Sequence, residues 1–366
     1  MTLTKIQTIA SGTGATIRTI DSKLQDVVSV KDFGAKGDNN TDDSAAIQAA
    51  HDSLSSGGTL FFPAGTYRAN VVLTKDNVNL MGTGKASVIA PTSGRCIFIS
   101  AIDQGNGGVV SGLTLSGVNG ATEGCRVEGF SRGCLENLYI TAINTGINID
   151  GDKSTETFFR DIYFYNINTT AVNYFRTDGV DTGGVYFYNL HHTGTNTSTS
   201  FSFTSSHSSR TRAFAFIDNC ILDNRNTYAI YCQNTTNFWV NNSWMTGTSN
   251  GKGLLTFDGS KQLQMNNTFV QNSHASGYNV NLLNNIEDLQ FDGCRFSGAG
   301  EDIHYAGNYT NGARVSMTDC IFTSSVQASN NTTRLGIHSG ARVIAPNGQA
   351  YSISVNNSGN IVNTAV

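Results

Sequence analysis

Two aspartates flank one asparagine near the middle of the chain: Asp218 precedes Asn219 directly, and Asp223 follows it four positions later. Hydrolysis of a glycosidic bond usually needs two carboxyl groups, because one protonates the leaving oxygen while the other activates water or attacks the sugar. We therefore regard Asp218 and Asp223 as candidate catalytic residues. Glu136 and Asp181 are two further candidates, and the alternative for each of the four is a solvated surface acid or the partner of an arginine.

Aromatic side chains and cations gather in the same part of the chain. Flat rings bind sugars through the C–H faces of the sugar, and tyrosine and tryptophan keep a polar group for hydrogen bonds. The candidate substrate-binding residues are Trp239, Trp244, Tyr163, Tyr186, Tyr188, His191 and Arg160. The alternative is that these rings pack against other copies of the chain, because exposed aromatic area of this extent marks an interface or a binding groove.

His191 also offers a different reaction. An imidazole can act as the base of a β-elimination on a uronate-containing polymer, with Arg160, Arg210 or Arg212 neutralising the sugar carboxylate. The sequence is compatible with both elimination and hydrolysis. We expect hydrolysis, because the chain contains the pair Asp218 and Asp223. The repeated positions hold no cluster of aspartates suited to calcium, so we expect no metal and no cofactor.

These residues belong to a repeat of about 25 residues. The repeat is aligned on nine anchor residues, which are Gly112, Asn137, Asp161, Asn189, Asn219, Asn242, Asn267, Gly293 and Asp319. Their spacings are 25, 24, 28, 30, 23, 25, 26 and 26 residues. A period of this length is typical of a solenoid, in which each repeat buries its apolar face only against its neighbours.

Apolar residues recur at fixed positions around the anchors. All nine residues two positions before an anchor are apolar, and so are eight of the nine residues three positions after it, His192 being the exception. Alternate side chains of a strand point to opposite faces, so these positions line the interior and their neighbours face outward. The anchor is Asn in five of nine repeats. It marks a bend between two strands, where stacked amides can hydrogen-bond along the axis.

This register predicts which side chains are accessible. All the candidate residues aligned with an anchor face outward, with Trp244 outside and Leu222 inside as the clearest pair. We expect His192 to be a core histidine bonded to the backbone. Three cysteines at one inward position, Cys220, Cys294 and Cys320, are expected to form a buried stack of thiols.

The predicted architecture is all-β: a right-handed parallel β-helix with one N-terminal capping α-helix over about residues 41–55. Thr41 is the expected N-cap, with Asp42 and Asp43 at the positive end of the helix dipole. The expected domains are a leader or attachment segment at 1–30, the β-helix at 31–333, and a C-terminal cap or assembly segment at 334–366. The regular coils are expected over about residues 105–325.

Composition argues against several classes of protein. The net charge is −4 and only 14 % of residues are charged, which argues against a basic nucleic-acid surface and a polybasic membrane anchor. No apolar run approaches the length of a membrane span, and Met1 to Ala10 lacks the apolar block of a secretory signal. The 7 cysteines have no metal-like spacing, so we expect neither a disulfide framework nor a zinc site.

Three segments near the N-terminus resemble a known family. They are Ser29-Val-Lys-Asp-Phe-Gly-Ala-Lys-Gly-Asp38, Thr41-Asp-Asp-Ser-Ala-Ala-Ile-Gln48 and Phe61-Phe-Pro-Ala-Gly-Thr-Tyr67. Together they are similar to the pectate-lyase-like β-helix superfamily and, within it, to bacteriophage tailspikes and tail depolymerases. The resemblance covers roughly residues 18–84, and beyond them only the style of the repeat matches.

The resemblance implies a homotrimer in the phage tail that binds, and usually cleaves, a bacterial surface polysaccharide such as capsule or O-antigen. Other phage tail or baseplate proteins are the implied partners within the virion, and neither nucleic acid nor membrane is expected as a partner. We therefore expect a polysaccharide depolymerase, more specifically a glycoside hydrolase. The alternatives are a polysaccharide lyase, a non-enzymatic adhesin of the same fold, and a structural tail protein.

Overall fold

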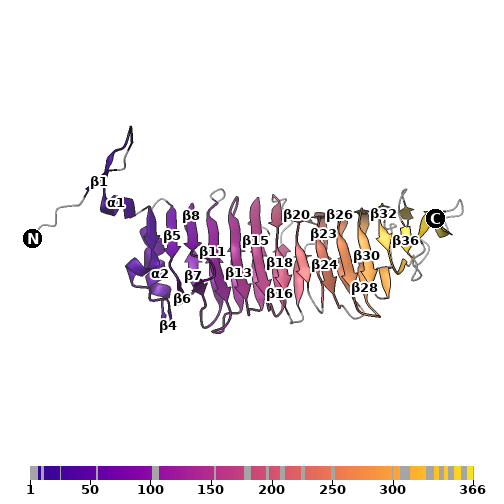
Figure 1. Cartoon of the computed structure of the whole chain (residues 1–366), viewed down its shortest axis with the longest axis horizontal. Helices are drawn as coiled ribbons and strands as arrows, with labels where there is room; N and C mark the ends of the chain where they lie inside the picture. The colour runs from indigo at the N-terminus through magenta and orange to yellow at the C-terminus, as the bar shows by residue number, and fades with distance from the viewer. Residues whose placement is uncertain are drawn as a thin grey trace, which may run out of the picture.

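The structure is a computed structural model of the chain. It describes residues 7–9, 12–24, 26–54, 57–100, 107–151, 154–176, 183–194, 198–206, 211–223, 227–248, 252–284, 286–298, 300–305, 314–326, 334–337, 342–344, 350–355 and 361–365. Over these residues the chain winds into an elongated stack of coils, with β1 and α1 projecting beyond the first coils (Figure 1). The parallel β-helix predicted from the repeat is confirmed.

Three strand faces make up each coil. The first face contains β3 (Val27–Ser29), β5 (Gly58–Phe62), β8 (Val78–Gly82), β11 (Val109–Ser116), β13 (Cys134–Thr141), β15 (Thr157–Tyr165), β17 (Val185–Tyr188), β20 (Thr211–Asp218), β23 (Thr235–Asn241), β26 (Lys261–Asn266), β29 (Glu287–Asp292), β32 (Arg314–Thr318) and β35 (Arg334–Ile337). Successive strands pair in parallel, so each coil lies about 4.8 Å above the one before it.

The second face follows the anchor bend. It contains β4 (Asp38–Asp42), β6 (Gly65–Arg68), β9 (Ser87–Ile89), the C-terminal halves of β11, β13 and β15, β18 (His191–Thr193), β21 (Ile221–Asp223), β24 (Trp244–Gly247), β27 (Phe269–Asn272), β30 (Arg295–Gly298), β33 (Ile321–Phe322) and β36 (Arg342–Ile344). The bend lies inside the long strands β11, β13 and β15, and in later coils it separates two short strands.

The third face is an 11-stranded parallel sheet. Its strands are β7 (Val71–Leu73), β10 (Arg95–Ile99), β12 (Glu123–Glu128), β14 (Thr145–Asp150), β16 (Thr170–Arg176), β19 (Thr199–Ser205), β22 (Ile230–Gln233), β25 (Gly253–Asp258), β28 (Tyr278–Leu283), β31 (Glu301–Tyr305) and β34 (Ser325–Val326). This sheet closes each coil on the side away from the anchor bend.

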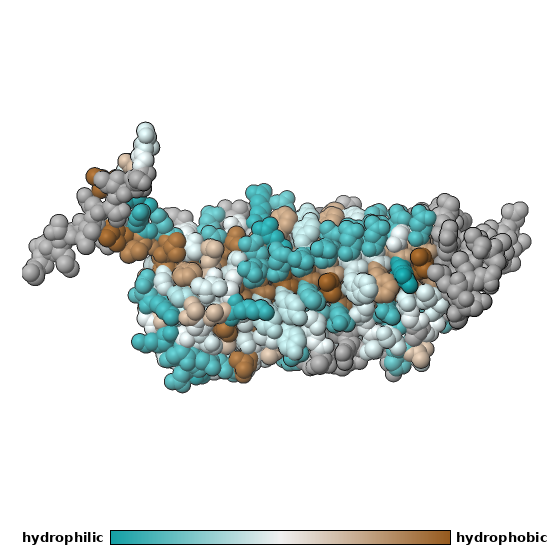
Figure 2. Space-filling model, in the orientation of Figure 1, coloured by the Kyte–Doolittle hydropathy of each residue, from teal (hydrophilic) through white to brown (hydrophobic). Residues whose placement is uncertain are grey.

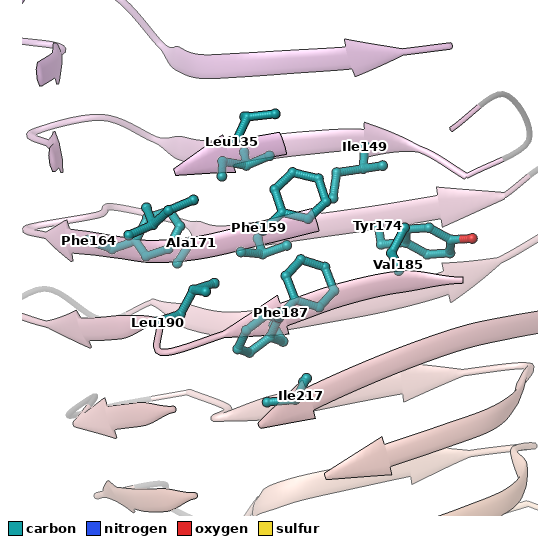
Figure 3. Close-up of a cluster of buried hydrophobic side chains, with 14 of the residues drawn as sticks. Leu135, Ile149, Phe159, Phe164, Ala171, Tyr174, Val185, Phe187, Leu190 and Ile217 are labelled. Carbon is teal, nitrogen blue, oxygen red and sulfur yellow. The ribbon is translucent and has the colours of Figure 1, made fainter. Parts of the chain in front are cut away.

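The register predicted from the anchors is confirmed. Leu135 pairs with Phe159, Phe159 with Phe187, and Phe187 with Ile217 on the next coil. Figure 3 shows these four side chains stacked inside the solenoid. Trp244 is 51 % exposed while Leu222 is 1 % exposed, so the two residues lie on the predicted sides of the wall.

The anchor bend has one physical cause in all nine repeats. Every anchor adopts the left-handed backbone conformation, with φ from 48° at Asn267 to 68° at Gly112. Asn, Asp and Gly tolerate this conformation best, which is why these three residue types occupy the position. The amide of Asn189 donates from Nδ2 to Oδ1 of Asp161 on the preceding coil over 2.6 Å, so anchor side chains bond along the axis as expected.

His192 is the polar member of an otherwise apolar inward position. It is 2 % exposed, which confirms a core histidine. The expectation that it bonds to the backbone is wrong, because its Nδ1 lies 2.8 Å from the Ser200 hydroxyl and its Nε2 lies 3.4 Å from the Ser198 hydroxyl. Ser200 lies in β19 of the third face, and Ser198 directly precedes that strand.

All seven cysteines are free thiols. Cys220, Cys294 and Cys320 are buried, and Cys294 and Cys320 occupy adjacent coils. Burial holds the pKa of Cys220 at about 12, so its thiol stays protonated at neutral pH. The burial predicted for these thiols is confirmed, but the single stack is wrong, because Ser243 and Thr268 occupy the coils between Cys220 and Cys294.

The N-terminal end of the solenoid is covered by a helix, α2 (Ser44–Ser53), with Ile47, Ala50 and Leu54 buried. The expected N-cap, Thr41, is wrong: Thr41 lies in β4 and its hydroxyl donates to Asp38. Asp43 is the N-cap residue instead.

Asp43 is buried, and its carboxylate does not cap the helix. It accepts hydrogen bonds from the backbone N–H groups of Lys36 and Gly37, over 2.6 and 3.0 Å. The N-cap residue therefore anchors the Ala35–Gly37 turn against α2.

Three elements precede this turn. A 3-10 turn, η1, spans Val30–Phe33. The leader contains a short helix, α1 (Ile20–Leu24), and a hairpin of β1 (Gln7–Ile9) and β2 (Ile17–Thr19).

The ends of the β-helix differ slightly from the expected boundaries of 31 and 333. Val27–Ser29 already pairs in parallel with β5, and Arg334–Ile337 still pairs in parallel with β32. Antiparallel pairing begins only after β36, with β37 (Ala350–Val355) and β38 (Ile361–Ala365). The division of the chain into three functional segments stays a prediction.

Candidate functional site

Two rows of outward side chains run along the solenoid on either side of the anchor bend. The first-face row lies three positions before each anchor and includes Phe158, Tyr186, Phe216, Trp239 and Gln264. The second-face row lies two positions after each anchor and includes Tyr139, Tyr163, His191, Ile221, Trp244, Phe269 and Arg295. Figure 2 shows apolar surface as a narrow band along the molecule, bordered by hydrophilic surface.

The aromatic rings of the first-face row stack on one another. The centroid distances are 4.9 Å for Phe158–Tyr186, 5.0 Å for Tyr186–Phe216 and 4.5 Å for Phe216–Trp239, with interplanar angles of 15°, 8° and 6°. Trp239 then donates from Nε1 to Oε1 of Gln264 over 3.0 Å. Both faces of Tyr186 are therefore covered by neighbouring rings, and this row presents ring edges to its surroundings.

The rings of the second-face row are arranged in more than one way. Tyr139 and Tyr163 stack with centroids 5.5 Å apart and planes at 12°. Further along the row, Tyr163 meets His191 edge-on at 81°, and Trp244 and Phe269 have centroids 4.3 Å apart with planes tilted by 38°. Trp244 is 51 % exposed and Ile221 beside it is 45 % exposed. The tilted and half-exposed Trp244 leaves part of its face free, so its end of the second-face row is the better platform for stacking a sugar.

Cations lie at both ends of the second-face row. Lys85 places its Nζ 4.3 Å from the centroid of Tyr139 and 5.9 Å from that of Tyr163. Arg295 lies 5.8 Å from the centroid of Phe269. Sequence reasoning missed Lys85 because it precedes the anchored repeats, and only the pairing of β9 with β11 brings it to this row.

Asp218 and Asp223 lie on opposite sides of the Asn219 bend. Asp218 is half-buried at the end of the first face, and its Oδ1 accepts from Nδ2 of Asn242 over 2.9 Å. Asp223 is exposed on the second face, and its Oδ1 accepts from the Thr246 hydroxyl over 2.7 Å. The extended chain from Asn219 to Asp223 spans about 13 Å, so the two carboxylates approach the roughly 6.5–9.5 Å of an inverting pair only by leaning across the bend.

Two titratable side chains of the preceding coil stand beside these aspartates. Tyr188 pairs in register with Asp218, and desolvation, together with Tyr186 and Asp218, raises the pKa of the Tyr188 phenol. Thr193, two residues after His191, pairs with Asp223. Desolvation lowers the pKa of His191 against the opposing influence of Asp223, which favours a neutral imidazole. A neutral imidazole is the form that can accept a proton.

Glu136 and Arg160 form an ion pair with each other. Arg160 Nε donates to Oε2 of Glu136 over 2.6 Å, and this hydrogen bond raises the pKa of the Arg160 guanidinium. The alternative expected for Glu136, a surface partner of arginine, is therefore present in the structure. Asp181 and Arg210 lie outside the described residues, as does the side chain of Arg212.

A second group of charged side chains lies on the third face, which the positions aligned on the anchors do not include. Glu128 pairs in register with Asp150 on the next coil, which sets their backbones about 4.8 Å apart. Arg126 donates from Nε to Oε1 of Glu128 over 2.9 Å, and its guanidinium lies 4.7 Å from the centroid of Phe175. The alternation of polar and apolar residues in 123–128 and 145–150 was the signal that could have found this group.

The described ranges contain no group of three or more His, Cys, Asp or Glu side chains arranged to hold a metal ion. Within the same ranges, none of the helices has the length and apolar character needed to cross a membrane.

Comparison with known proteins gives two kinds of similarity. Residues 27–107 match the family model described as rhamnogalacturonase A/epimerase, pectate lyase-like. Alginate lyase 7 of Azotobacter vinelandii is 38 % identical over 123 residues, covering 29 % of this chain and 14 % of that protein. The tail spike protein of Shigella phage Sf6 is 41 % identical over 88 residues, covering 22 % of this chain and 14 % of that protein.

The similarity of the fold extends much further than that of the sequence. The A-module of the mannuronan C-5 epimerase AlgE6 of Azotobacter vinelandii superposes with a TM-score of 0.68 at 17 % identity, covering 87 % of this chain and all 100 % of that module. The curated relatives above are matched over only 14 % of their length. The resemblance to pectate-lyase-like β-helix proteins, phage tailspikes among them, is confirmed.

Proposed function

We propose that this protein is a phage tailspike that binds and depolymerises a bacterial surface polysaccharide. The observation that carries the proposal is the second-face row, where the half-exposed Trp244, further aromatic rings and two cations line the solenoid beside His191, Asp218 and Asp223. A row that spans several coils suits a long polymer better than a small molecule, because each coil adds about 4.8 Å of contact. The similarity of 88 residues of this chain to the tail spike protein of Shigella phage Sf6 supports the setting in a virion.

Hydrolysis through Asp218 and Asp223 is the first candidate reaction. One carboxyl protonates the glycosidic oxygen, and the other, as a carboxylate, activates water on the opposite side of the sugar ring. Each carboxylate already accepts a hydrogen bond from the next coil, which holds its orientation. Trp244 lies between the residues that make these two bonds and offers the stacking surface for a sugar.

Elimination with His191 as the base is the second candidate reaction. The lowered pKa of His191 supports it, because a neutral imidazole can remove the proton next to a uronate carboxylate. Lys85 is a described cation near the same row that can neutralise such a carboxylate. Arg160 is less suited than expected, since it is bonded to Glu136.

Incubation of the protein with purified host capsule or O-antigen tests the proposal. New reducing ends without the ultraviolet absorbance of an unsaturated uronate indicate hydrolysis, whereas a rise in that absorbance indicates elimination. Binding without fragments would favour an adhesin and contradict the enzymatic part of the proposal. The absence of both binding and fragments would contradict the proposal as a whole.

Substitutions assign the reaction to residues. Asp218→Asn and Asp223→Asn should each abolish hydrolysis while polymer binding persists, and His191→Gln should abolish elimination. Asp292→Asn is the matched control, because Asp292 occupies the position of Asp218 three coils later and is exposed. Normal turnover by both aspartate variants would discard this site, and Glu128→Gln and Asp150→Asn would then test the third face.

A further inference from the structure

A cluster of aromatic side chains lies on the third face, on the side of the solenoid away from the anchor bend. Tyr228 and Tyr231 have ring centroids 5.2 Å apart, with planes tilted by 40°. Two coils later, Tyr278 stacks on His304 with centroids 3.9 Å apart and planes at 4°. All four residues are partly exposed, and we call them the third-face cluster. The function proposed above uses none of them.

One face of the Tyr278 ring is covered and the other is not. His304 comes from the coil after Tyr278, so its ring covers the face turned toward that coil. The residue in register on the preceding coil is Gly253, which has no side chain to cover the opposite face. Close packing requires glycine at this position, because a Cβ there would lie 2.4 Å from Cβ of Asn281. The cluster therefore presents a tyrosine face that no in-register side chain covers.

A buried amide lies beside this uncovered face. Asn281 follows Tyr278 in the same strand, packs against Gly253 and is only 9 % exposed. Its Oδ1 is buried and has no hydrogen-bond partner in the part of the chain that the structure describes. A buried acceptor without a donor costs free energy, and a hydroxyl donated by a bound molecule would remove that cost.

Charged and polar groups border the same rings. Nδ1 of His304 lies 2.7 Å from Oε2 of Glu301, so Nε2 is the ring nitrogen left for a ligand. Nζ of Lys252 lies 5.5 Å from the centroid of Tyr228. The opposite charges of Lys252 and Glu301 do not select an ion of either sign. An aromatic face with polar groups at its edge suits a neutral sugar ring, which offers C–H bonds to the face and hydroxyls to the edge.

We propose that the third-face cluster is a second carbohydrate-binding site, in which one sugar residue stacks on the uncovered face of Tyr278 and donates a hydroxyl to Oδ1 of Asn281. Oδ1 is covered by its surroundings, so the sugar reaches it through a side-chain rotation of the kind that is common on binding. The inference goes beyond the proposed function, because it requires binding and no cleavage. A site on this side of the solenoid keeps the protein attached to one polymer segment while the second-face row releases another.

Calorimetric titration tests the second site with short oligosaccharides obtained by mild acid hydrolysis of host capsule or O-antigen. The parent protein should bind at two sites per chain, because such a molecule is too short to reach both faces. Trp244→Ala should weaken one site about tenfold and Tyr278→Ala the other, and the double variant should weaken both. A single site per chain, or two unchanged sites in Tyr278→Ala, would overturn the inference.

Phe175→Ala is the matched control for Tyr278→Ala. Phe175 is a partly exposed ring on the same face, four coils earlier, and the guanidinium of Arg126 lies 4.7 Å from its centroid. Because this ring is already covered, its loss should leave both sites unchanged. An equal loss of affinity in Phe175→Ala and Tyr278→Ala would show a general effect of removing a ring and would overturn the role of Tyr278.

Asn281→Leu tests the buried acceptor. Leucine has nearly the size of asparagine and needs no hydrogen bond, so stability in urea should be kept or increased while the affinity of the third-face site falls about tenfold. Lower stability with unchanged affinity would show that the amide serves the fold and would overturn its part in binding.

Cleavage and mass separate this inference from the proposed function. Tyr278→Ala should cleave polysaccharide with the kcat of the parent protein. Third-face binding by a protein that cleaves nothing would refute the enzymatic function and keep the second site. A large loss of kcat in Tyr278→Ala would make the cluster part of the catalytic site, and a lower mass in light scattering would make it a contact between chains. Either result would overturn the inference.

Discussion

His192 and Asp302 are both buried inside the solenoid, and burial shifts their pKa values in opposite directions. His192 is neutral because burial, with a smaller contribution from His191, lowers its pKa to about 4. Asp302 on the third face is fully buried, and desolvation raises its pKa to about 6 despite hydrogen bonds from Asn279 and the Ser324 backbone. Both residues therefore make stability depend on pH.

For His192 we expect a loss of stability in acid. A lowered pKa in the folded state means that its contribution is complete above pH 6.5 and is lost as pH falls through about 4. The full difference is on the order of 3 kcal/mol. Urea unfolding of the parent and of His192→Leu at a series of pH values should show a flatter profile for the variant between these limits. Identical pH profiles would contradict a buried neutral imidazole.

For Asp302 we expect the opposite sign. A raised pKa in the folded state means that its contribution is complete below pH 3.8 and is lost as pH rises through about 6. The effect of Asp302→Asn on stability should therefore be more favourable at pH 7 than at pH 4, by a difference on the order of 3 kcal/mol. Thermal unfolding at the two pH values measures this. Equal effects at both values would show that the carboxyl is not shifted.

At the scale of elements, the two tryptophans on either side of the anchor bend differ in the arrangement of their rings. Trp239 on the first face stacks nearly parallel to Phe216, with 6° between the planes, whereas Trp244 and Phe269 on the second face are tilted by 38°. Parallel stacking uses ring faces to stabilise the solenoid, and tilting leaves a face for a ligand. Tryptophan is thus covered by a parallel ring on one side of the anchor bend and half-exposed on the other.

This difference predicts separate effects for the two tryptophans. Trp244→Ala should weaken binding of the host polysaccharide about tenfold, with little change in stability. Trp239→Ala should cost about 2 kcal/mol of unfolding free energy and leave binding nearly unchanged. Isothermal titration with oligosaccharide and urea unfolding of both variants provide the comparison. Weaker binding in Trp239→Ala than in Trp244→Ala would reverse the assignment of the rows.

At the scale of the whole molecule, the first-face row offers a surface for other copies of the chain. Phe158, the first ring of the first-face row, is 38 % exposed. The rings of this row stack face to face, so their edges form a band without charged side chains on the surface. Apolar bands of this kind are commonly buried in oligomers. We propose that a homotrimer covers the first face and leaves the second-face row open to polysaccharide.

Light scattering tests this arrangement. The parent protein should have three times the mass of one chain, and Phe158→Arg should shift it toward the monomer, because a guanidinium buried in an apolar interface has no partner. Arg295→Gln on the second face is the control and should keep the trimer. A monomeric parent protein would exclude the trimer, and a trimer unaffected by Phe158→Arg would place the interface elsewhere.

The sequence by itself determined the coil register. Side chains alternate along a strand, so a one-residue error would have exchanged core and surface at every repeat, and the recurrence of apolar residues around the anchors left one solution. Trp244 and Leu222 therefore lie where the alignment placed them. The sequence also indicated the left-handed bends, since Asn, Asp and Gly share the ability to adopt them.

Only the tertiary structure decided how side chains from different coils meet. The hydrogen bonds from Asn242 to Asp218 and from Thr246 to Asp223 join residues 23 or 24 positions apart, and the repeat gives no indication of which rotamers make them. The stacking of Tyr186 between two rings, and the approach of Lys85 to Tyr139, likewise depend on side-chain directions between neighbouring coils. A pattern along the chain fixes the face of a residue, whereas its partners follow from packing in three dimensions.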